Sequence, residues 1–239
     1  MTTRYLRIVV TPTCTLQCSF CYMEGDVAVQ GRQKGVPRAE LVRLVAVGYK
    51  EGVRKVKLLG GEPLIRADLP QLIAELLAAT GSDLDLSLIT AGVVPVKNLH
   101  AAFAAGLQRA NLSIHGWSAE ALARNTKTRD AWAMRQRNLE ALLAYGRPLK
   151  CNYVYTGPEV EADLAAFLRW AADKPLTVAV LDDLGVDQDG PAVVRQALLR
   201  MHGPWQDSFR EDDPNSLPTQ RLHWAEGLVV EVKDHQLGQ

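Results

Sequence analysis

The sequence lacks a long hydrophobic run, a net charge and any internal repeat. A helix that crosses a bilayer needs about 20 consecutive apolar residues, and no stretch approaches that length. Lys and Arg together number 27, as do Asp and Glu, so bulk charge attracts neither nucleic acid nor an anionic membrane. We therefore expect neither a membrane nor a nucleic acid polymer as a partner.

The N-terminus lacks a secretory signal, and cysteine is scarce. Residues 1–13 contain only a short apolar run, which fits a buried strand better than a signal peptide. The chain has 4 cysteines, of which Cys14, Cys18 and Cys21 lie close together while Cys151 is far away. We expect a cytoplasmic protein. In that reducing compartment, clustered cysteines bind metal or carry out redox chemistry more often than they form disulfides.

The sequence does contain a regular alternation of strand-like and helix-like segments. Hydrophobic residues make up 47% of the 239 residues, enough to fill a large core. The predicted strands cover residues 7–11, 55–59, 84–90, 109–114, 149–155 and 177–181. The predicted helices cover residues 38–50, 68–79, 96–105, 129–145 and 160–172. This alternation predicts an α/β fold with a parallel sheet, either doubly wound or curled into a barrel, with functional groups at the C-terminal strand ends.

The pattern changes after residue 181. A polar stretch is followed by a segment with helical periodicity at residues 191–201, and later by two strand-like runs around Glu226 and Gly227. We expect two parts: a main domain of residues 1–185, and an extension of residues 186–239 that contains a short helix and a β-hairpin. In the main domain, Asp68 is the expected N-cap of the second helix.

The first predicted strand leads directly into the cysteine-rich stretch TPTCTLQCSFC. Thiolates at this spacing can converge on one metal centre, and soft sulfur ligands select zinc, copper(I) or an iron–sulfur cluster. Structural zinc sites and ordinary ferredoxin clusters take four protein ligands, one more than this loop supplies. Three thiolates on a four-iron cluster leave one iron open to a ligand that is not protein. A zinc site is an alternative, and so is a redox pair of Cys18 and Cys21, which leaves Cys14 without a role.

The stretch CTLQCSFC resembles the CxxxCxΦC motif of the radical S-adenosylmethionine (radical SAM) superfamily. The resemblance implies that Cys14, Cys18 and Cys21 hold a [4Fe-4S] cluster, whose open iron takes the amino and carboxylate groups of S-adenosylmethionine (SAM). It also implies that Phe20 contacts the adenine of SAM. By the same resemblance, the fold is a partial (β/α)6 barrel of the TIM type, and the C-terminal extension covers its opening.

Further stretches support the resemblance. Taken alone, Gly60 and Gly61 predict only a tight turn, but LLGGEPL resembles the family's GGE motif, and Glu62 suits the ammonium group of SAM. In the fourth predicted strand, alternation puts three polar residues on one face, and we favour a structural role for His115 among them. The resemblance implies that the residues that contact SAM are Phe20, Gly60, Gly61, Glu62, Pro63, Ser113 and Asn152.

Five stretches resemble, in order and spacing, the family of GTP 3',8-cyclases that begin molybdenum cofactor synthesis. They are LRIVVTPTCTLQCSFCYMEG, LLGGEPLIRADLPQLI, LITAG, ANLSIHG and LKCNYVYTG. In that family, basic residues at the positions of Arg7, Lys57 and Lys150 meet the triphosphate substrate, and a threonine matches Thr90. Each cation alone fits a solvated charge or an ion pair, but the three together indicate a small anionic substrate.

The cyclases hold a second cluster with a C-terminal cysteine trio, whereas only Cys151 follows Cys21 here. We therefore expect one cluster. By alternation along the fifth predicted strand, Cys151 faces away from Lys150 and Asn152, as a structural thiol would.

The resemblance implies an oxygen-sensitive enzyme that takes one electron from an external flavodoxin or ferredoxin. It would cleave SAM reductively to methionine and a 5'-deoxyadenosyl radical, which abstracts hydrogen from the substrate. We expect a nucleotide, nucleotide-sugar or sugar acid as the substrate of a biosynthetic tailoring step. A peptide substrate, undergoing epimerisation or cross-linking, is the alternative. A non-enzymatic iron–sulfur electron carrier or binding module is another, and the motifs do not separate lyase, isomerase and oxidoreductase outcomes.

Overall fold

A computed structural model describes residues 5–16, 18, 21, 35–124, 126, 128–182, 190–210 and 219–233. In this part of the chain one curved sheet has nine strands in the order β1-β2-β3-β4-β5-β6-β9-β8-β7. The strands are β1 (Tyr5–Thr11), β2 (Lys55–Gly60), β3 (Asp85–Thr90), β4 (Arg109–Ile114), β5 (Leu149–Tyr155), β6 (Thr177–Asp182), β7 (Gln206–Arg210), β8 (Thr219–His223) and β9 (Val229–Lys233).

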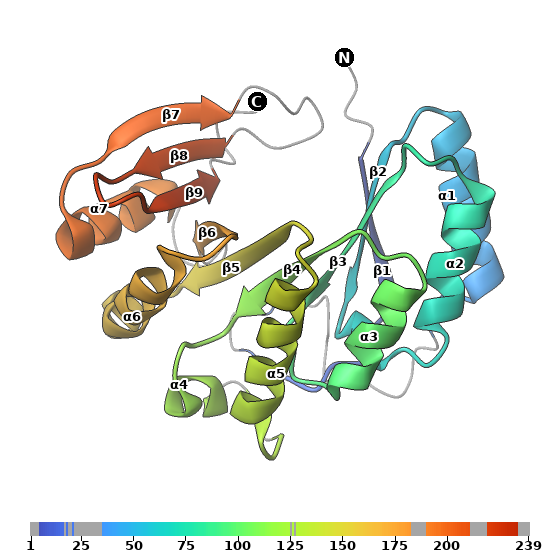
Figure 1. The fold of residues 1–239 in the computed structure, drawn as a ribbon, viewed down its shortest axis with the longest axis horizontal. Helices are drawn as coiled ribbons and strands as arrows, with labels where there is room; N and C mark the ends of the chain where they lie inside the picture. The colour runs from blue at the N-terminus through green and yellow to red at the C-terminus, as the bar shows by residue number, and fades with distance from the viewer. Residues whose placement is uncertain are drawn as a thin grey trace.

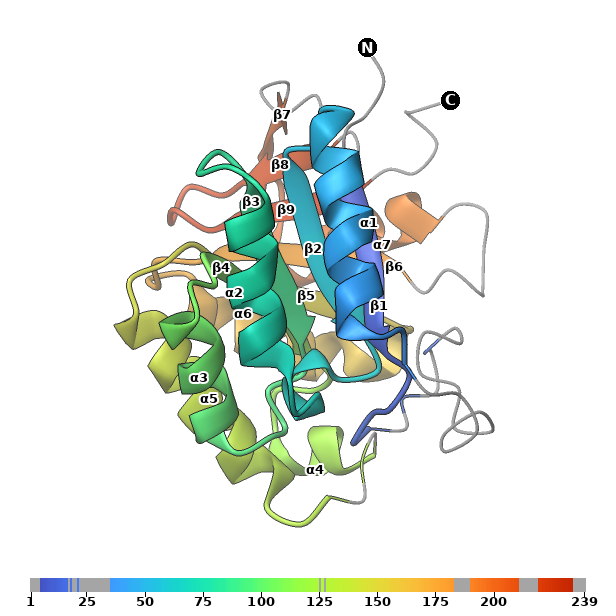
Figure 2. The same cartoon turned by 90° about the vertical axis from the view of Figure 1, so that its right-hand side faces the viewer.

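Helices cover the convex side of this sheet, as Figures 1 and 2 show. They are α1 (Arg38–Lys50), α2 (Leu69–Ala79), α3 (Val96–Ala104), α4 (Ala119–Ala123), α5 (Ala131–Ala144), α6 (Glu161–Ala171), α7 (Gly190–His202) and two 3-10 turns, η1 (Pro63–Ile65) and η2 (Pro158–Val160). Strands β1 to β6 pair in parallel with their neighbours in chain order. The predicted α/β fold with a partial (β/α)6 barrel is confirmed.

The core lies between the sheet and the helices. Every second residue of a strand points outward to this layer, so Ile8, Val10, Cys151 and Tyr153 are buried among apolar helix residues. The alternate positions face the concave side, the barrel lumen, and many of them are polar. The prediction that Cys151 faces away from the lumen agrees with its complete burial.

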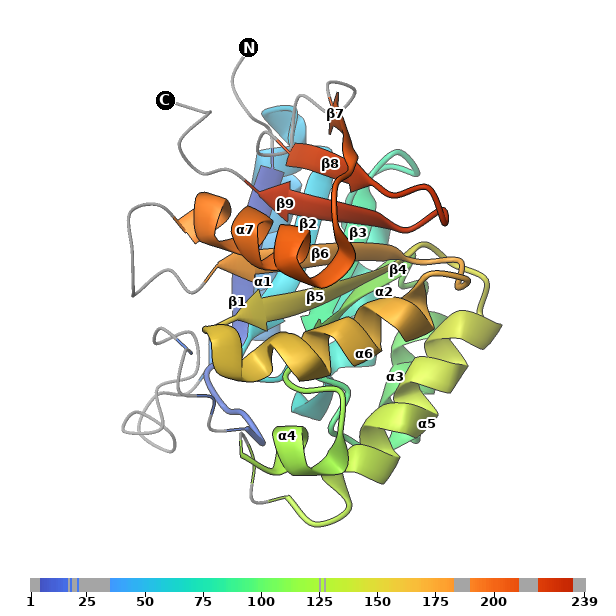
Figure 3. The ribbon, with the colours of Figure 1, turned by 90° about the vertical axis from the view of Figure 1, so that its left-hand side faces the viewer.

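The C-terminal extension continues the sheet. The predicted helix is α7, and the predicted hairpin is formed by β8 and β9, which join through the turn at Trp224 to Leu228. Strand β9 pairs in parallel with β6, so it adds a seventh strand in the barrel direction, and β8 and β7 follow in antiparallel pairing. Figure 3 shows these strands beside α7. Strand β7 was not expected from the sequence.

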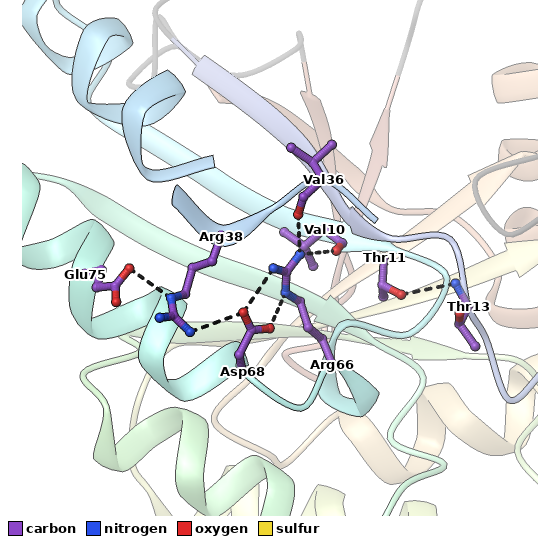
Figure 4. Close-up of polar contacts among 8 residues, drawn as sticks. All are labelled: Val10, Thr11, Thr13, Val36, Arg38, Arg66, Asp68 and Glu75. Atoms are coloured by element: carbon purple, nitrogen blue, oxygen red, sulfur yellow. Dashed lines mark hydrogen bonds and ion pairs between the residues drawn. The ribbon is translucent and has the colours of Figure 1, made fainter. Parts of the chain in front are cut away.

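The prediction that Asp68 is the N-cap residue of α2 is confirmed for its position. Asp68 occupies the N-cap position but makes no side-chain capping bond. Its carboxylate instead binds two arginines: Arg66 Nε lies 2.7 Å from Oδ1, and Arg38 Nη1 lies 3.4 Å from Oδ2 (Figure 4). Arginine offers charge-assisted bonds that outweigh one N–H cap.

None of the helices in the described part of the chain is both long and apolar enough to cross a bilayer.

Candidate functional site

The cysteine loop leaves β1 at the C-terminal edge of the sheet and packs against the region around α4. Leu16 is buried beside Leu122 and Ala131 in a small apolar cluster. The hydroxyl groups of Thr126 and Thr128 donate to the carbonyl oxygen of Thr15 at 3.1 and 3.2 Å. Figures 2 and 3 show residues 11–16 next to α4. The loop is thus anchored by contacts far away in sequence.

The three thiols lie near one another at this edge. Cys14 and Cys18 are half-buried and Cys21 is exposed. Burial raises the pKa of Cys18 to about 12, and the neighbouring thiols Cys21 and Cys14 add to this rise. Burial also raises the pKa of Cys14, with smaller effects of Glu62 and Cys21. In the described residues, no three Cys, His, Asp or Glu side chains form a single-ion site. A bound cation would favour the thiolates that this crowding disfavours.

The glycine turn after β2 sits directly on the cysteine loop. The N–H of Gly61 donates to Thr11 O and that of Glu62 to Thr13 O, both at 2.8 Å. A side chain on Gly61 would overlap Thr13 O and lie 2.9 Å from the backbone nitrogen of Cys14. Gly60 has a φ of +146° and faces Thr11 O equally closely. Only glycine permits this approach, so the two predicted motifs form one unit.

Glu62 joins this unit to the loop after β3. It is 1% exposed, and its two carboxylate oxygens accept N–H groups of Leu64 at 3.1 Å and Ala91 at 2.9 Å. Burial raises its pKa to about 6, against the opposing effect of these bonds and of Thr90. Thr90 is also buried, and its hydroxyl accepts the N–H of Gly92 at 2.9 Å. Both side chains therefore position loops, and neighbouring Pro63 begins the buried turn η1.

Polar side chains line the lumen on β4 and β5. Ser113 and Asn152 lie directly opposite each other in the β4–β5 ladder, so the structure brings these two predicted residues together. Asn111 is 3% exposed, and its amide oxygen has no hydrogen-bond partner among the described residues. A buried acceptor of this kind is unusual unless a ligand or water satisfies it. Phe20, predicted to contact adenine, lies outside the described residues.

A cavity of about 260 Å³ opens at the C-terminal ends of β4 and β5. Its polar lining includes His115, Arg124, Thr156 and Glu159, and apolar side chains complete it. Burial, together with the charge of Arg135, lowers the pKa of His115 to about 4. The imidazole is therefore neutral at pH 7 and offers one donor and one acceptor.

Arg135 on α5 is a functional candidate that the sequence analysis missed. It is fully buried, and in the described part of the chain none of its three guanidinium nitrogens has a hydrogen-bond partner. The guanidinium lies 4.7 Å from the ring centroid of Trp132 and 5.8 Å from that of Trp117. Burial lowers its pKa to about 10, so it stays charged at pH 7. The Asp163 carboxylate opposes this lowering of the pKa, so the charge of Arg135 is partly balanced while its guanidinium N–H groups lack hydrogen-bond acceptors among the described residues.

Three predicted substrate-binding cations take different positions. Arg7 and Lys57 are directly opposite each other in the β1–β2 ladder, and Lys57 Nζ lies 5.6 Å from the ring centroid of Tyr5. Lys150 lies on β5, where its ammonium group forms an ion pair with Glu231 of β9. The structure therefore brings Arg7 and Lys57 together, and gives Lys150 a carboxylate partner that sequence patterns did not indicate.

Comparison with known proteins agrees with this geometry. A sequence model of the radical SAM superfamily matches residues 8–171. The GTP 3',8-cyclase of Heliobacterium modesticaldum is 31% identical over 182 residues, which cover 74% of this chain and 54% of the relative. That of Rhodococcus opacus is 32% identical over 188 residues, covering 78% and 53%. The chain spans about half the length of the curated relatives it matches.

Solved structures share the fold at low sequence identity. Streptococcus suis SuiB bound to the precursor peptide SuiA has a TM-score of 0.64 and 16% identity, covering 82% of this chain and 45% of that chain. Methylornithine synthase (PylB) has a TM-score of 0.61 and 18% identity, covering 82% and 62%. Because the superfamily match spans more than half of the chain, the protein belongs to the radical SAM superfamily of enzymes, whose members bind a [4Fe-4S] cluster and SAM.

Proposed function

We propose that the chain holds one [4Fe-4S] cluster through Cys14, Cys18 and Cys21, and cleaves SAM reductively to remove a hydrogen atom from a small anionic substrate. The observation that carries this proposal is the close contact between the glycine turn and the cysteine loop. The backbone N–H groups of Gly61 and Glu62 donate hydrogen bonds of 2.8 Å to backbone carbonyl oxygens where that loop begins. This contact joins the metal-binding motif to the GGE motif at the sheet edge where barrels carry their chemistry.

The residues of this unit suit both cofactors. When bound, the cluster supplies an electron that breaks a carbon–sulfur bond of SAM and yields the 5'-deoxyadenosyl radical. The three thiolates hold iron, and Gly60 and Gly61 leave room beside them for the methionine part of SAM. Glu62 is a positioning residue, and its charge also favours a nearby ammonium group.

Arg135 is the proposed partner of the SAM carboxylate. Its guanidinium is buried without hydrogen bonds among the described residues, next to Trp132, which packs against the same apolar cluster as Cys14 and Cys18. A carboxylate there would accept charge-assisted hydrogen bonds in a site shielded from water.

The cavity at the ends of β4 and β5 is the proposed site of the nucleoside part of SAM. Neutral His115 and the hydroxyl of Thr156 supply hydrogen-bonding groups, while Ile114 and Val154 supply apolar contacts. Ser113 and Asn152 lie opposite each other on β4 and β5, and we assign them to the ribose and methionine parts. Phe20 remains the proposed adenine contact.

The substrate is proposed to lie in the lumen with its anionic group near Arg7 and Lys57. Two cations paired across neighbouring strands give a local positive field in a protein without net charge. The relatives named GTP 3',8-cyclase act on an anionic nucleotide, which supports a nucleotide, nucleotide-sugar or sugar acid here. We keep Thr90 as a proposed substrate-binding residue and residues 186–239 as the part that completes the pocket. Lys150 is proposed to line the substrate site as one half of its ion pair with Glu231, not as a separate anchor for an anion.

A peptide substrate is the second candidate, because SuiB, whose structure holds a precursor peptide, shares this fold. Deuterium transfer into 5'-deoxyadenosine distinguishes the two. Labelled nucleotides, sugar acids and peptides are supplied in turn, and only the true substrate class enriches the product.

The central test is anaerobic reconstitution with iron and sulfide, followed by dithionite and SAM. We expect about four irons per chain and formation of 5'-deoxyadenosine. Cys18→Ala should abolish both, whereas Cys151→Ala, which removes the buried thiol on β5, should keep both. A flavodoxin or ferredoxin should replace dithionite as the electron donor. A reduced, fully loaded protein that yields no 5'-deoxyadenosine would contradict the proposal, and iron loss in Cys151→Ala would contradict the single-cluster assignment.

A further inference from the structure

A buried carboxylate from the C-terminal extension faces the barrel lumen. Glu231 on β9 is 1% exposed and lies in register with Ala179 of β6 on one side and Arg221 of β8 on the other. Its Oε2 forms an ion pair with Lys150 Nζ. Its Oε1 accepts from Nε and Nη2 of Arg221, both at 3.4 Å. One anion therefore bridges two cations from different strands.

A small residue on the intervening strand allows this bridge. Strand β6 lies between β5 and β9, and Asn152, Ala179 and Glu231 share one level of the sheet. Lys150 lies two residues before Asn152 on β5, so the two side chains point to the same face of the sheet. The long side chain of Lys150 reaches across β6 to Glu231. Ala179 is completely buried beneath this region. A larger side chain at Ala179 would occupy the space that the ion pair crosses.

The bridge changes the charge that this wall presents. Glu231 is 2% exposed at its side chain and Lys150 is 18% exposed, so water screens their attraction weakly. Within this group of three described side chains, two cations and one anion sum to a single positive charge. Arg221, with a 35% exposed side chain and long bonds to Glu231, is the more accessible of the two cations. On this wall, Arg221 is thus the accessible cation, and the buried carboxylate of Glu231 lies directly behind it.

We propose that Glu231 is a specificity-determining residue of the lumen: by neutralising Lys150, it makes the wall of β5, β6 and β9 accept a single carboxylate or phosphodiester and reject a polyphosphate. This rests on the proposed function, since it assumes that the lumen holds the substrate. A polyphosphate would approach a buried carboxylate, and like charges in a poorly screened site repel strongly. Among the expected substrates, the inference favours sugar acids over nucleoside triphosphates and nucleotide-sugars.

Binding of inorganic tripolyphosphate and of GTP tests this proposal. The reconstituted holoprotein with SAM is titrated calorimetrically at low salt, in the wild type and in Glu231→Gln, Lys150→Gln and the double variant. Glu231→Gln should bind both polyphosphates at least roughly tenfold more tightly, because it frees Lys150 and Arg221 for the ligand. Lys150→Gln alone should not tighten polyphosphate binding, because it leaves the buried carboxylate of Glu231 without its lysine partner. The double variant should lose most of the gain.

Glu226→Gln, an exposed glutamate on the turn of the same hairpin, is the matched control and should leave the affinity unchanged. Thermal unfolding checks that each variant is folded. If Glu231→Gln does not fold, the double variant decides. Its polyphosphate affinity should stay within about threefold of wild type, since the removed pair carries no net charge, and a tenfold loss would identify Lys150 as an available anion anchor and overturn the proposal. Unchanged affinity in a folded Glu231→Gln overturns it too. These titrations do not depend on SAM cleavage, so a failed cleavage assay remains a separate result.

Discussion

At the scale of single residues, we expect substitution of the buried Arg135 to change protein stability and SAM binding in opposite directions. Replacing a buried cation that lacks hydrogen bonds by an apolar side chain removes a desolvation penalty. We expect Arg135→Met to raise the free energy of unfolding by about 1–3 kcal/mol while weakening SAM binding at least roughly tenfold. Urea denaturation and equilibrium SAM binding measure the two effects.

The exposed neighbour Arg137 on the same helix provides the control for Arg135. Arg137→Met should alter neither quantity beyond about 0.5 kcal/mol. If Arg135→Met destabilised the fold and bound SAM normally, its role would be structural and our assignment would fail.

His115 should make stability depend on pH. Its pKa is about 4 in the folded chain and 6.5 in the unfolded chain, so the unfolded chain binds more protons between these values. The stability is fully present above pH 6.5 and is lost as pH falls towards 4, by roughly 2 kcal/mol at pH 5. Urea midpoints of the cluster-free, reduced chain at pH 7 and pH 5 measure this loss.

His115→Gln should reduce the pH dependence. Glu62, whose pKa is raised to about 6, titrates in the same range with the opposite sign. The contribution of His115 must therefore be taken from the difference between wild type and variant. Equal pH slopes in both proteins would refute it.

At the scale of elements, one arginine holds the start of the cysteine loop against α2. Arg66 Nη1 donates to Val10 O at 2.6 Å and to Val36 O at 3.1 Å, and the same guanidinium binds Asp68 (Figure 4). Arg66→Ala would leave the buried Val10 carbonyl without its side-chain donor. We expect a loss of about 1–3 kcal/mol in the free energy of unfolding, together with lower iron content after reconstitution.

Arg38→Ala removes the outer end of this network. Arg38 is 36% exposed at its side chain and binds Asp68 and Glu75, so its loss should cost less than about 1 kcal/mol and leave iron content unchanged. Equal effects of the two substitutions on iron content would mean that Arg66 does not position the loop.

The elements that sequence patterns predicted are those with their own apolar signal. Strands β1 to β6 and the long helices were predicted within about two residues, because each carries a strand or helix period. Strand β7, with the sequence QDSFR, has no such signal and is a strand because β8 pairs with it. Asp68 was correctly predicted as the N-cap of α2, but its carboxylate binds two arginines, Arg66 and Arg38, whose position beside it depends on the fold.

In the candidate site, too, the sequence predicted those features that have a local motif. The motif spacing located the cysteine loop and the glycine turn, but the Lys150–Glu231 pair joins residues 81 positions apart and leaves no local pattern. Arg135 did leave one: it shares a helix face with Ala131, Asn138 and Leu142, which are all buried. A charged residue on the buried face of a predicted helix is unusual, and this pattern could have identified Arg135 as a candidate from the sequence.

At the scale of the whole molecule, the C-terminal strands give the barrel a second source of lumen side chains. The proposed cofactor residues lie on the loops that follow β1, β2 and β4, on β4 and β5, and on α5, whereas β8 and β9 supply Arg221 and Glu231. The proposed substrate residues therefore come from both ends of one sheet: Arg7 and Lys57 from β1 and β2, and Glu231 from β9. We therefore expect substitutions at Glu231 to alter polyphosphate binding while the iron content after reconstitution stays unchanged.

The backbone bonds between the glycine turn and the cysteine loop have an evolutionary consequence. Gly61 and Glu62 hold the loop through the carbonyl oxygens of Thr11 and Thr13, which every amino acid possesses. We therefore expect the amino acid at position 13 to vary among homologues without moving the three thiols. We expect only glycine at position 61, because any side chain there would overlap the carbonyl oxygen of Thr13.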